Sequence, residues 1–174
     1  QVRRGQVRAA CVLNRRIAVY RDVKGAVHAL DARCSHMGAD LSLGTVSDDR
    51  LRCPLHKWEY DPEGNVRVAP FESGVPARRV RSYPVCERYG TIWVFNGPRP
   101  LFDLFEVESR DYLWFTLPAQ TFRNHPHFLT ANGLDWRHLN TLHDMELARN
   151  SVCRRKEPFG VVVGSLAMGL IPPN

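Results

Sequence analysis

The sequence lacks the hallmarks of several large protein classes. No run approaches the roughly 18 apolar residues of a membrane-spanning helix, so we expect no membrane partner. Residues 1–8 are basic and no apolar segment follows them, which argues against a signal peptide. No internal repeat or low-complexity tract is visible either. With 174 residues, 44% hydrophobic and 24% charged, the chain has a globular composition and room for one domain or two small ones.

Cysteines are few, and none forms a C-x-x-C pair. Their number, five, is odd, which argues against a scaffold held together by disulfides. Free thiols persist in a reducing compartment, so we expect the protein to work in the cytoplasm.

Positive charge is in excess, with 24 basic and 18 acidic residues and a net charge of +6. The basic residues are scattered, and no helix-length basic stripe or aromatic stacking platform accompanies them, so we expect no nucleic-acid partner. Two interpretations of the excess remain open. It is either a solvated surface or a docking surface for an acidic electron-transfer partner.

The chain divides into a β-rich part and a mixed part. The β-rich part contains five expected strands, Val7–Leu13, Ile17–Arg21, Val27–Leu30, Arg79–Val85 and Thr91–Phe95, and two loop-like stretches between residues 33 and 68. Residues 96–100 resemble a linker, which predicts domains at 1–100 and 101–174. In the second domain we expect a strand at Leu113–Leu117, a mostly helical Phe128–Arg149, and a strand or strand pair in Val161–Ile171.

Two short segments combine cysteine with histidine. Cys34-Ser35-His36 and Cys53-Pro54-Leu55-His56 give the pattern C-x-H…C-x-x-H. Two thiolates and two imidazoles bind either a tetrahedral zinc ion or a [2Fe–2S] cluster that has cysteines on one iron and histidines on the other. In zinc fingers the cysteines usually form one close pair and the histidines another. Here each segment supplies one of each, which favours the binuclear cluster.

The surroundings of these four residues resemble a known family. Residues 34–41 and 53–64 are similar to the two cluster-binding loops of a Rieske iron–sulfur domain, and the likeness extends over about residues 5–100. The resemblance implies an all-β domain. It also implies that Cys34 and Cys53 bind the ferric iron, whereas His36 and His56 bind the redox-active iron.

Four positions in these loops depart from other Rieske proteins. Gly38, Leu55 and Trp58 stand where respiratory Rieske proteins have a disulfide and a cluster-bonding serine, which favours the lower-potential oxygenase or ferredoxin type. Lys57 stands where most relatives have glycine. A lysine there either raises the reduction potential slightly or points to solvent, and we expect the latter.

A second constellation follows in the predicted helix. Asp135, His138 and His143 form D-x-x-H-x-x-x-x-H and fall within an arc of about 140° on a helix, so we expect the helix to distort or end near His143. Two imidazoles and a carboxylate are the ligand types of non-haem Fe(II) oxygenases. Taken alone, two histidines on one helix face are more often structural.

Together, the two constellations resemble the catalytic (alpha) subunit of Rieske non-haem iron oxygenases. The resemblance implies that residues 101–174 begin an α+β catalytic domain with an antiparallel sheet. It assigns His138 and His143 to a mononuclear Fe(II), Asn132 to a supporting role, and Asp135 to a bridge that reaches a cluster histidine of the neighbouring subunit in a homotrimer. The third iron ligand is a carboxylate further downstream. The acidic residues that follow His143 do not suit that role (Asp144, Glu146 and Glu157), so we expect the chain to be incomplete.

The resemblance also predicts the reaction. O₂ is activated with electrons that pass from NAD(P)H through a reductase or ferredoxin, and a small organic substrate is hydroxylated, demethylated or desaturated. Two alternatives remain. A Rieske ferredoxin-like electron-transfer protein would lack oxygenase activity, and a zinc-binding interaction module would be colourless.

Overall fold

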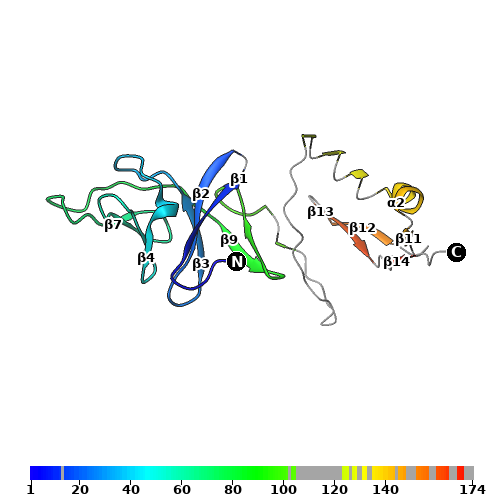
Figure 1. The fold of residues 1–174 in the computed structure, drawn as a ribbon, viewed down its shortest axis with the longest axis horizontal. Helices are drawn as coiled ribbons and strands as arrows, with labels where there is room; N and C mark the ends of the chain where they lie inside the picture. The colour runs from blue at the N-terminus through cyan, green and yellow to red at the C-terminus, as the bar shows by residue number, and fades with distance from the viewer. Residues whose placement is uncertain are drawn as a thin grey trace. The chain divides into compact units, whose positions relative to one another are not determined.

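A computed structural model describes residues 1–12, 14–101, 103–104, 123–125, 127–128, 131–132, 135–143, 145–147, 152–156, 160–164 and 168–170. The chain forms two compact units, Gln1–Phe115 and Thr116–Asn174, which we treat separately (Figure 1). All strand pairs between the described residues are antiparallel, and strands far outnumber helices, which confirms the predicted mostly-β fold class. The predicted functional boundary between residues 100 and 101 lies inside the first unit and stays a prediction.

The first sheet contains the expected N-terminal hairpins. Its strands are β1 (Val7–Val12), β2 (Arg15–Arg21), β3 (Val27–Asp31) and β8 (Ser82–Tyr83), in the order β1-β2-β3-β8. The turn after β2 forms because the Asp22 carboxylate accepts hydrogen bonds from the amides of Gly25 (2.6 Å) and Ala26 (2.8 Å). His28 lies 3.1 Å from the same carboxylate. The predicted strands before and after this turn are therefore confirmed.

A second four-stranded sheet lies in the region that the sequence indicates as loops. It contains β4 (Thr45–Ser47), β5 (Arg50–Arg52), β6 (Glu59–Tyr60) and β7 (Val66–Val68), and the short 3-10 helix η1 (Leu41–Leu43) precedes it. The prediction of loops alone was wrong here. Strands of two or three residues are too short to show the alternation on which strand prediction depends.

The predicted strand Arg79–Val85 is interrupted. Pro84 separates β8 from β9 (Val85–Arg88), because proline has no amide hydrogen to continue the ladder. Strand β9 then pairs with β10 (Thr91–Val94) through a tight turn in which Tyr89 and Gly90 have φ of 57° and 68°. Positive φ at both central residues is the requirement of a type I′ hairpin turn.

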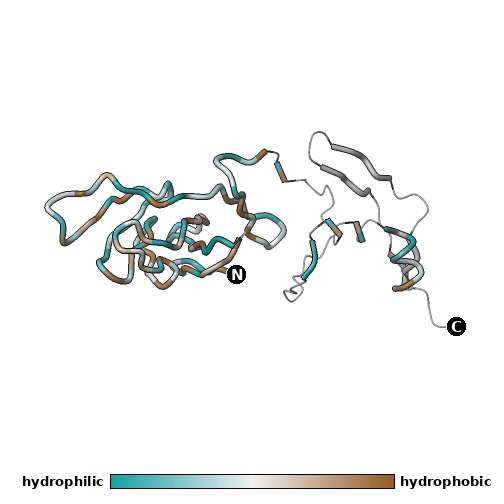
Figure 2. The backbone as a smooth tube through the Cα atoms, turned by 90° about the horizontal axis from the view of Figure 1, so that it is seen from above, coloured by the Kyte–Doolittle hydropathy of each residue, from teal (hydrophilic) through white to brown (hydrophobic). Residues whose placement is uncertain are grey.

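The main core of the first unit lies between the two four-stranded sheets. It joins Tyr20 and Leu30 of the first sheet to Leu51 and Tyr60 of the second, all fully buried. Hydrophobic and hydrophilic segments interleave along the chain in this unit (Figure 2). Cys34 and Cys53 belong to the same buried cluster, so the core and the candidate metal ligands are continuous.

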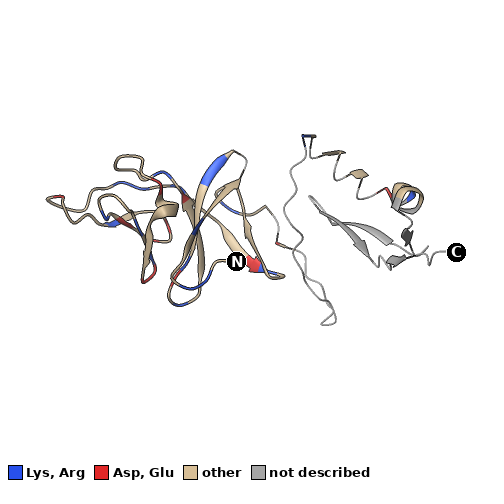
Figure 3. Ribbon diagram, in the orientation of Figure 1, with Lys and Arg blue, Asp and Glu red and all other residues tan. Residues whose placement is uncertain are grey.

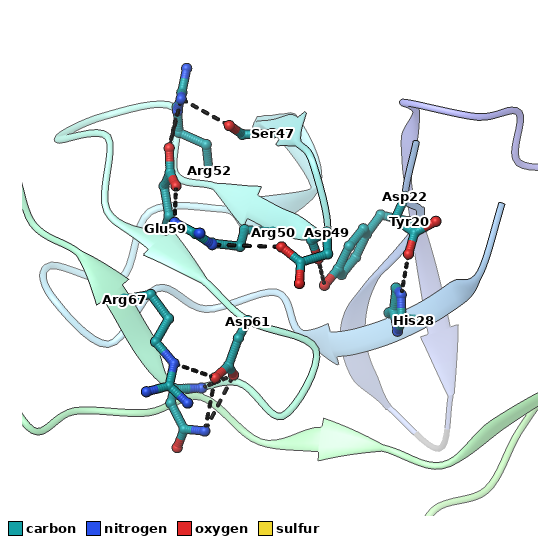
Figure 4. Close-up of polar contacts among 11 residues, drawn as sticks. Tyr20, Asp22, His28, Ser47, Asp49, Arg50, Arg52, Glu59, Asp61 and Arg67 are labelled. Carbon is teal, nitrogen blue, oxygen red and sulfur yellow. Dashed lines mark hydrogen bonds and ion pairs between the residues drawn. The ribbon is translucent and has the colours of Figure 1, made fainter. Parts of the chain in front are cut away.

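Two buried carboxylates fix strand β6. Glu59 lies between Arg50 and Arg52, with oxygen–nitrogen distances of 3.2 and 2.6 Å. Asp61 accepts a hydrogen bond from Arg67 at 2.6 Å (Figure 4). Because burying an unpaired carboxylate is costly, these ion pairs hold the two residues on either side of Tyr60, and the Tyr60 side chain packs into the core.

Among the described residues, the second unit contains helix α2 and two strand pairs, and residues 127–128 and 131–132 are helical as well. Helix α2 spans Trp136–His143, β11 (Met145–Leu147) pairs with β14 (Met168–Leu170), and β12 (Val152–Lys156) pairs with β13 (Gly160–Gly164). The helix ends at His143 as expected, but the prediction of helix through residue 149 was wrong, because Met145–Leu147 is extended. The expected strands in Val161–Ile171 are confirmed as β13 and β14. Leu113–Leu117 lies outside the described residues, and none of the described helices could cross a membrane.

Candidate metal centre

The two cluster-type loops share one backbone design. The amide of Cys34 donates to the carbonyl of Ala39 at 2.9 Å, and the amide of Cys53 donates to the carbonyl of Trp58 at 2.8 Å. In each loop the residue four positions after the cysteine is in the left-handed region, with φ of 75° at Gly38 and 59° at Lys57. Both loops therefore close with the same backbone geometry. In each loop the histidine lies between the two residues whose backbone hydrogen bond closes the loop.

The two thiols meet at the bottom of these loops. Cys34 and Cys53 are 3% and 2% exposed, and the thiol of Cys53 lies within hydrogen-bonding reach of Cys34. Burial raises the pKa of the Cys53 thiol, while the amides of Leu55 and His56, which donate to it, act in the opposite direction. These two amide groups donate to the Cys53 sulfur, which would be a thiolate in a metal complex.

Tyr60 is the polar neighbour of the thiol pair. Its hydroxyl lies 3.0 Å from the Sγ of Cys34 and accepts a hydrogen bond from the amide of Ser35 at 3.2 Å. The pKa of this phenol is raised above its ordinary value, mainly because the group is buried and also because it contacts Cys34. The hydroxyl thus keeps its proton and can donate it to a Cys34 thiolate. Sequence reasoning assigned no role to Tyr60, although it stands in the motif that carries the resemblance.

The two imidazoles form a second pair at the loop tips. The ring centroids of His36 and His56 are 4.7 Å apart, with the rings inclined at 65°. The Nδ1 atom of His36 is buried and has no hydrogen-bond partner among the described residues. A buried nitrogen with a free lone pair is costly unless it binds something, and a metal ion is the partner that this geometry fits.

Aromatic stacking fixes the orientation of His36. The Trp58 ring lies parallel to the imidazole, with 4.5 Å between centroids and 6° between planes, and is 2% exposed. The guanidinium of Arg78 lies 6.0 Å from the centre of the Trp58 ring and donates to the Ser35 carbonyl at 3.1 Å. The ligand ring is therefore held from one face by a buried tryptophan, which leaves its edge directed into the site.

Two charged residues lie near the outer side of the loops. The carboxylate of Glu72 is 3.9 Å from the Nε2 atom of His36, and both side chains are partly exposed. Lys57 is exposed, as expected, but it does not simply point to solvent. Its ammonium group donates to the carbonyl of Pro54 at 2.8 Å and so stays against its own loop.

The donor set fits a binuclear iron–sulfur cluster. No three His, Cys, Asp or Glu side chains converge on a single ion within the part of the chain that the structure describes. The four predicted ligands form instead a pair of thiols in the core and a pair of imidazoles at the surface. A [2Fe–2S] cluster with mixed ligands requires this division, because its two irons take the two kinds of ligand separately.

The second constellation lies at helix α2. Asp135 precedes the helix, and its Oδ1 accepts the amides of Arg137 at 3.1 Å and His138 at 3.2 Å. Asp135 is therefore the N-cap of α2, a role that the D-x-x-H pattern also allows and that the sequence interpretation missed. His138 lies in the first turn and His143 is the last helical residue. The assignment of His138 and His143 to iron stays a prediction.

Comparison with known proteins agrees with this geometry. Residues 1–84 match the family described as the Rieske [2Fe-2S] domain. This part of the chain, which contains all four predicted cluster ligands, therefore matches a Rieske domain.

Two of its relatives are named as a desaturase and as a subunit of a monooxygenase system. The chain is 30% identical over 151 residues to cholesterol 7-desaturase nvd 1 of Ciona intestinalis, covering 82% of this chain and 32% of that protein. It is 30% identical over 153 residues to the iron-sulfur subunit TsaM1 of the toluene-4-sulfonate monooxygenase system of Comamonas testosteroni, covering 83% of this chain and 44% of the relative. The chain thus spans between about a third and a half of these proteins' lengths.

A solved structure shares the fold as well. Dicamba monooxygenase with non-haem iron and dicamba superposes with a TM-score of 0.53 and 36% sequence identity, over 57% of this chain and 31% of that one. The predicted Rieske fold is confirmed, and the resemblance to Rieske oxygenase subunits is confirmed with it.

Proposed function

We propose that this chain is part of the catalytic subunit of a Rieske non-haem iron oxygenase. The whole protein would use O₂ and electrons from NAD(P)H, delivered by a reductase or ferredoxin, to hydroxylate, demethylate or desaturate a small organic substrate. Relatives named as desaturase, monooxygenase and O-demethylase support this range of reactions. The observation that carries the proposal is the buried, unpartnered Nδ1 of His36 above a buried thiol pair, followed in the same chain by the Asp135–His143 helix.

That geometry supports the proposed assignment of the cluster ligands. Cys34 and Cys53 would hold one iron, and His36 and His56 the other. When bound, the cluster supplies one-electron transfer to a mononuclear iron where O₂ is activated. Trp58 keeps the His36 ring in register, and Tyr60 holds a proton against the Cys34 sulfur.

The second metal would be bound by His138 and His143, with a carboxylate ligand from elsewhere in the protein. Asp135 would accept a hydrogen bond from a cluster histidine of the neighbouring subunit, in a homotrimer that works in the cytoplasm. Its Oδ1 already caps α2, so the bridge would use Oδ2. One carboxylate can serve both roles because its two oxygens have several lone pairs.

An Asp135→Asn variant tests this function. Asparagine is as good an N-cap as aspartate, so α2 should remain intact. The loss of charge should leave both metals bound and reduce single-turnover product formation at least tenfold. Asp135→Ala, which removes the cap as well, is the comparison for helix damage. Normal single-turnover product formation in Asp135→Asn would refute the bridge.

The electron-transfer alternative makes a different prediction. A ferredoxin-like protein would bind iron only in the cluster, so the full-length protein would contain no sulfide-free iron and would consume no O₂ with any substrate. The names of the relatives favour the oxygenase.

A further inference from the structure

A basic groove borders the first cluster loop. It is an open cavity of about 520 Å³, and residues 34–38, including the candidate ligand His36, line it. Arg33 precedes that loop in the lining, and Arg79 and Arg81 come from a segment further along the chain. Asp31 is the single acidic residue in the lining, and Glu72 lies outside it, 3.9 Å from the Nε2 atom of His36. Positive charge therefore predominates in the lining beside the loop that holds one of the candidate redox-active ligands.

No carboxylate pairs with the arginines of this groove among the described residues. Several other arginines of the first unit are paired, as in Arg16–Asp40, Arg21–Glu87, Arg52–Glu59 and Arg67–Asp61. Arg33 and Arg79 are exposed, and no carboxylate pairs with either within the described residues. Arg81 donates to the amide oxygen of Asn96 at 3.0 Å and lies 4.6 Å from the centre of the Tyr83 ring, both uncharged partners.

Both signs of charge occur over the first unit (Figure 3), so the excess in the groove is local. Arg78 adds a fourth cation beside it, bound to the Ser35 carbonyl and stacked over Trp58. A cluster of unpaired cations next to a site raises the encounter rate of negatively charged partners, and low ionic strength strengthens the effect.

The groove also gives access to the site. The side chain of His36 is 24% exposed, whereas the thiols below it are buried. A donor protein that settles over Arg33 and Arg79 would thus lie against the more accessible pair of ligands. A small anion would gain little here, since the groove is open and its cations come from two separate segments of the chain.

We propose that this groove is the docking surface for an acidic electron-transfer protein that reduces the cluster. This inference rests on the proposed function only in that the Rieske domain accepts electrons. In the step concerned, the donor's reduced centre loses one electron and the cluster gains it, and no bond is made or broken. Arg33 and Arg79 steer and orient the donor and take no part in the chemistry.

The test is the double variant Arg33→Glu/Arg79→Glu in the cluster-loaded full-length protein. The probe is a photoreduced, acidic [2Fe–2S] ferredoxin, and stopped-flow absorbance gives the second-order rate constant of cluster reduction. We expect this constant to fall at least tenfold at low ionic strength and to lose most of its salt dependence. The milder Arg33→Gln/Arg79→Gln pair should give a smaller loss of the same kind.

The matched control is Arg3→Glu/Lys24→Glu, which makes the same change in net charge at two exposed residues outside the groove. It should retain most of the rate. Reduction by the neutral photoreduced 5-deazariboflavin and the visible spectrum should match wild type in all variants, which separates loss of docking from loss of the cluster. The reduction potential of each variant is measured as well, because the loss of nearby cations lowers it and the rate has to be compared at equal driving force.

Three results would overturn the docking surface. One is an unchanged rate in Arg33→Glu/Arg79→Glu, and another is an equal loss in the control pair. The third is an altered oligomeric state with an unchanged donor rate, which would show that a second copy of the chain covers the groove. Absence of a cluster from wild type would instead refute the proposed function, and iron and sulfide analysis detects it.

Discussion

Tyr60 belongs to the hydrophobic core and also contacts a candidate cluster ligand, so it can influence the reduction potential of the cluster. Its hydroxyl reaches the Cys34 sulfur from strand β6, which Glu59 and Asp61 hold in place. A hydrogen bond to a thiolate sulfur stabilises the reduced cluster more than the oxidised one, because the reduced cluster carries more negative charge.

Tyr60→Phe should therefore lower the reduction potential. The difference in stabilisation is on the order of 1 kcal/mol, or about 40 mV for a one-electron couple. A spectroscopic redox titration measures it. Tyr20→Phe is the control, since Tyr20 is equally buried and donates instead to the Asp49 carbonyl at 3.0 Å. Equal shifts in both variants would disprove a specific effect on the sulfur.

Lys57 occupies a backbone conformation that suits glycine. Its φ of 59° matches the φ of 75° at Gly38 in the companion loop, and a non-glycine residue there is disfavoured by about 1 kcal/mol. Lys57→Gly relieves this strain and Lys57→Ala does not, although both remove the ammonium group.

We expect Lys57→Gly to melt about 3 °C above Lys57→Ala, the shift that about 1 kcal/mol gives in a protein of this size. Both variants should have a lower reduction potential than wild type, because a cation near the cluster favours the reduced state. Differential scanning calorimetry and redox titration provide the two readings. A melting temperature that is the same in both variants would contradict the backbone argument.

At the level of elements, the turn between β6 and β7 holds residues 79–81, which line the basic groove. The amide of Val80 donates to the Gly64 carbonyl at 2.8 Å, and Asn65 forms an isolated antiparallel β-bridge with Arg79 through the backbone. Gly64 has φ of 85°, and a Cβ atom on it would lie 2.2 Å from the carbonyl oxygen of Val80. The close approach of two backbones thus requires glycine here.

Gly64→Ala should destabilise the protein by about 3 kcal/mol, from the strained φ together with the clash. Gly90→Ala separates the two causes, because Gly90 has φ of 68° but no neighbouring atom within 4 Å of the added Cβ. We expect a loss of about 1 kcal/mol in that control. Chemical denaturation of the two variants gives the comparison, and equal losses would show that the clash is relieved at no cost.

Some elements follow from the sequence and others do not. Strands β1 to β3 are β-rich runs of five to seven residues and were predicted. Strands β4 to β7 have two or three residues each, and only their pairing in space defines them. The four candidate cluster ligands could be proposed from the sequence because each loop is local in sequence. The contacts of Arg78 and Glu72 with the first loop could not, since 43 residues separate Arg78 from Ser35.

For the whole molecule, the net charge of +6 left open a solvated surface or a docking surface. Part of the excess lies in the basic groove, where Arg33 and Arg79 have no carboxylate partner among the described residues, and its place beside the candidate ligand His36 favours the docking surface. The chain covers only part of the length of its relatives, so the substrate pocket and the third ligand of the mononuclear iron belong to the proposal and not to the described structure.

The central claim is that Cys34 and Cys53 bind one iron of a [2Fe–2S] cluster and that His36 and His56 bind the other. Pulsed EPR of the reduced protein, labelled with ¹⁵N-histidine and analysed for iron and acid-labile sulfide, tests it most directly. We predict hyperfine coupling from both imidazoles, with the coupling of one lost in His36→Cys. Zinc in place of iron, or a reduced cluster without coupling to histidine nitrogen, would contradict the account.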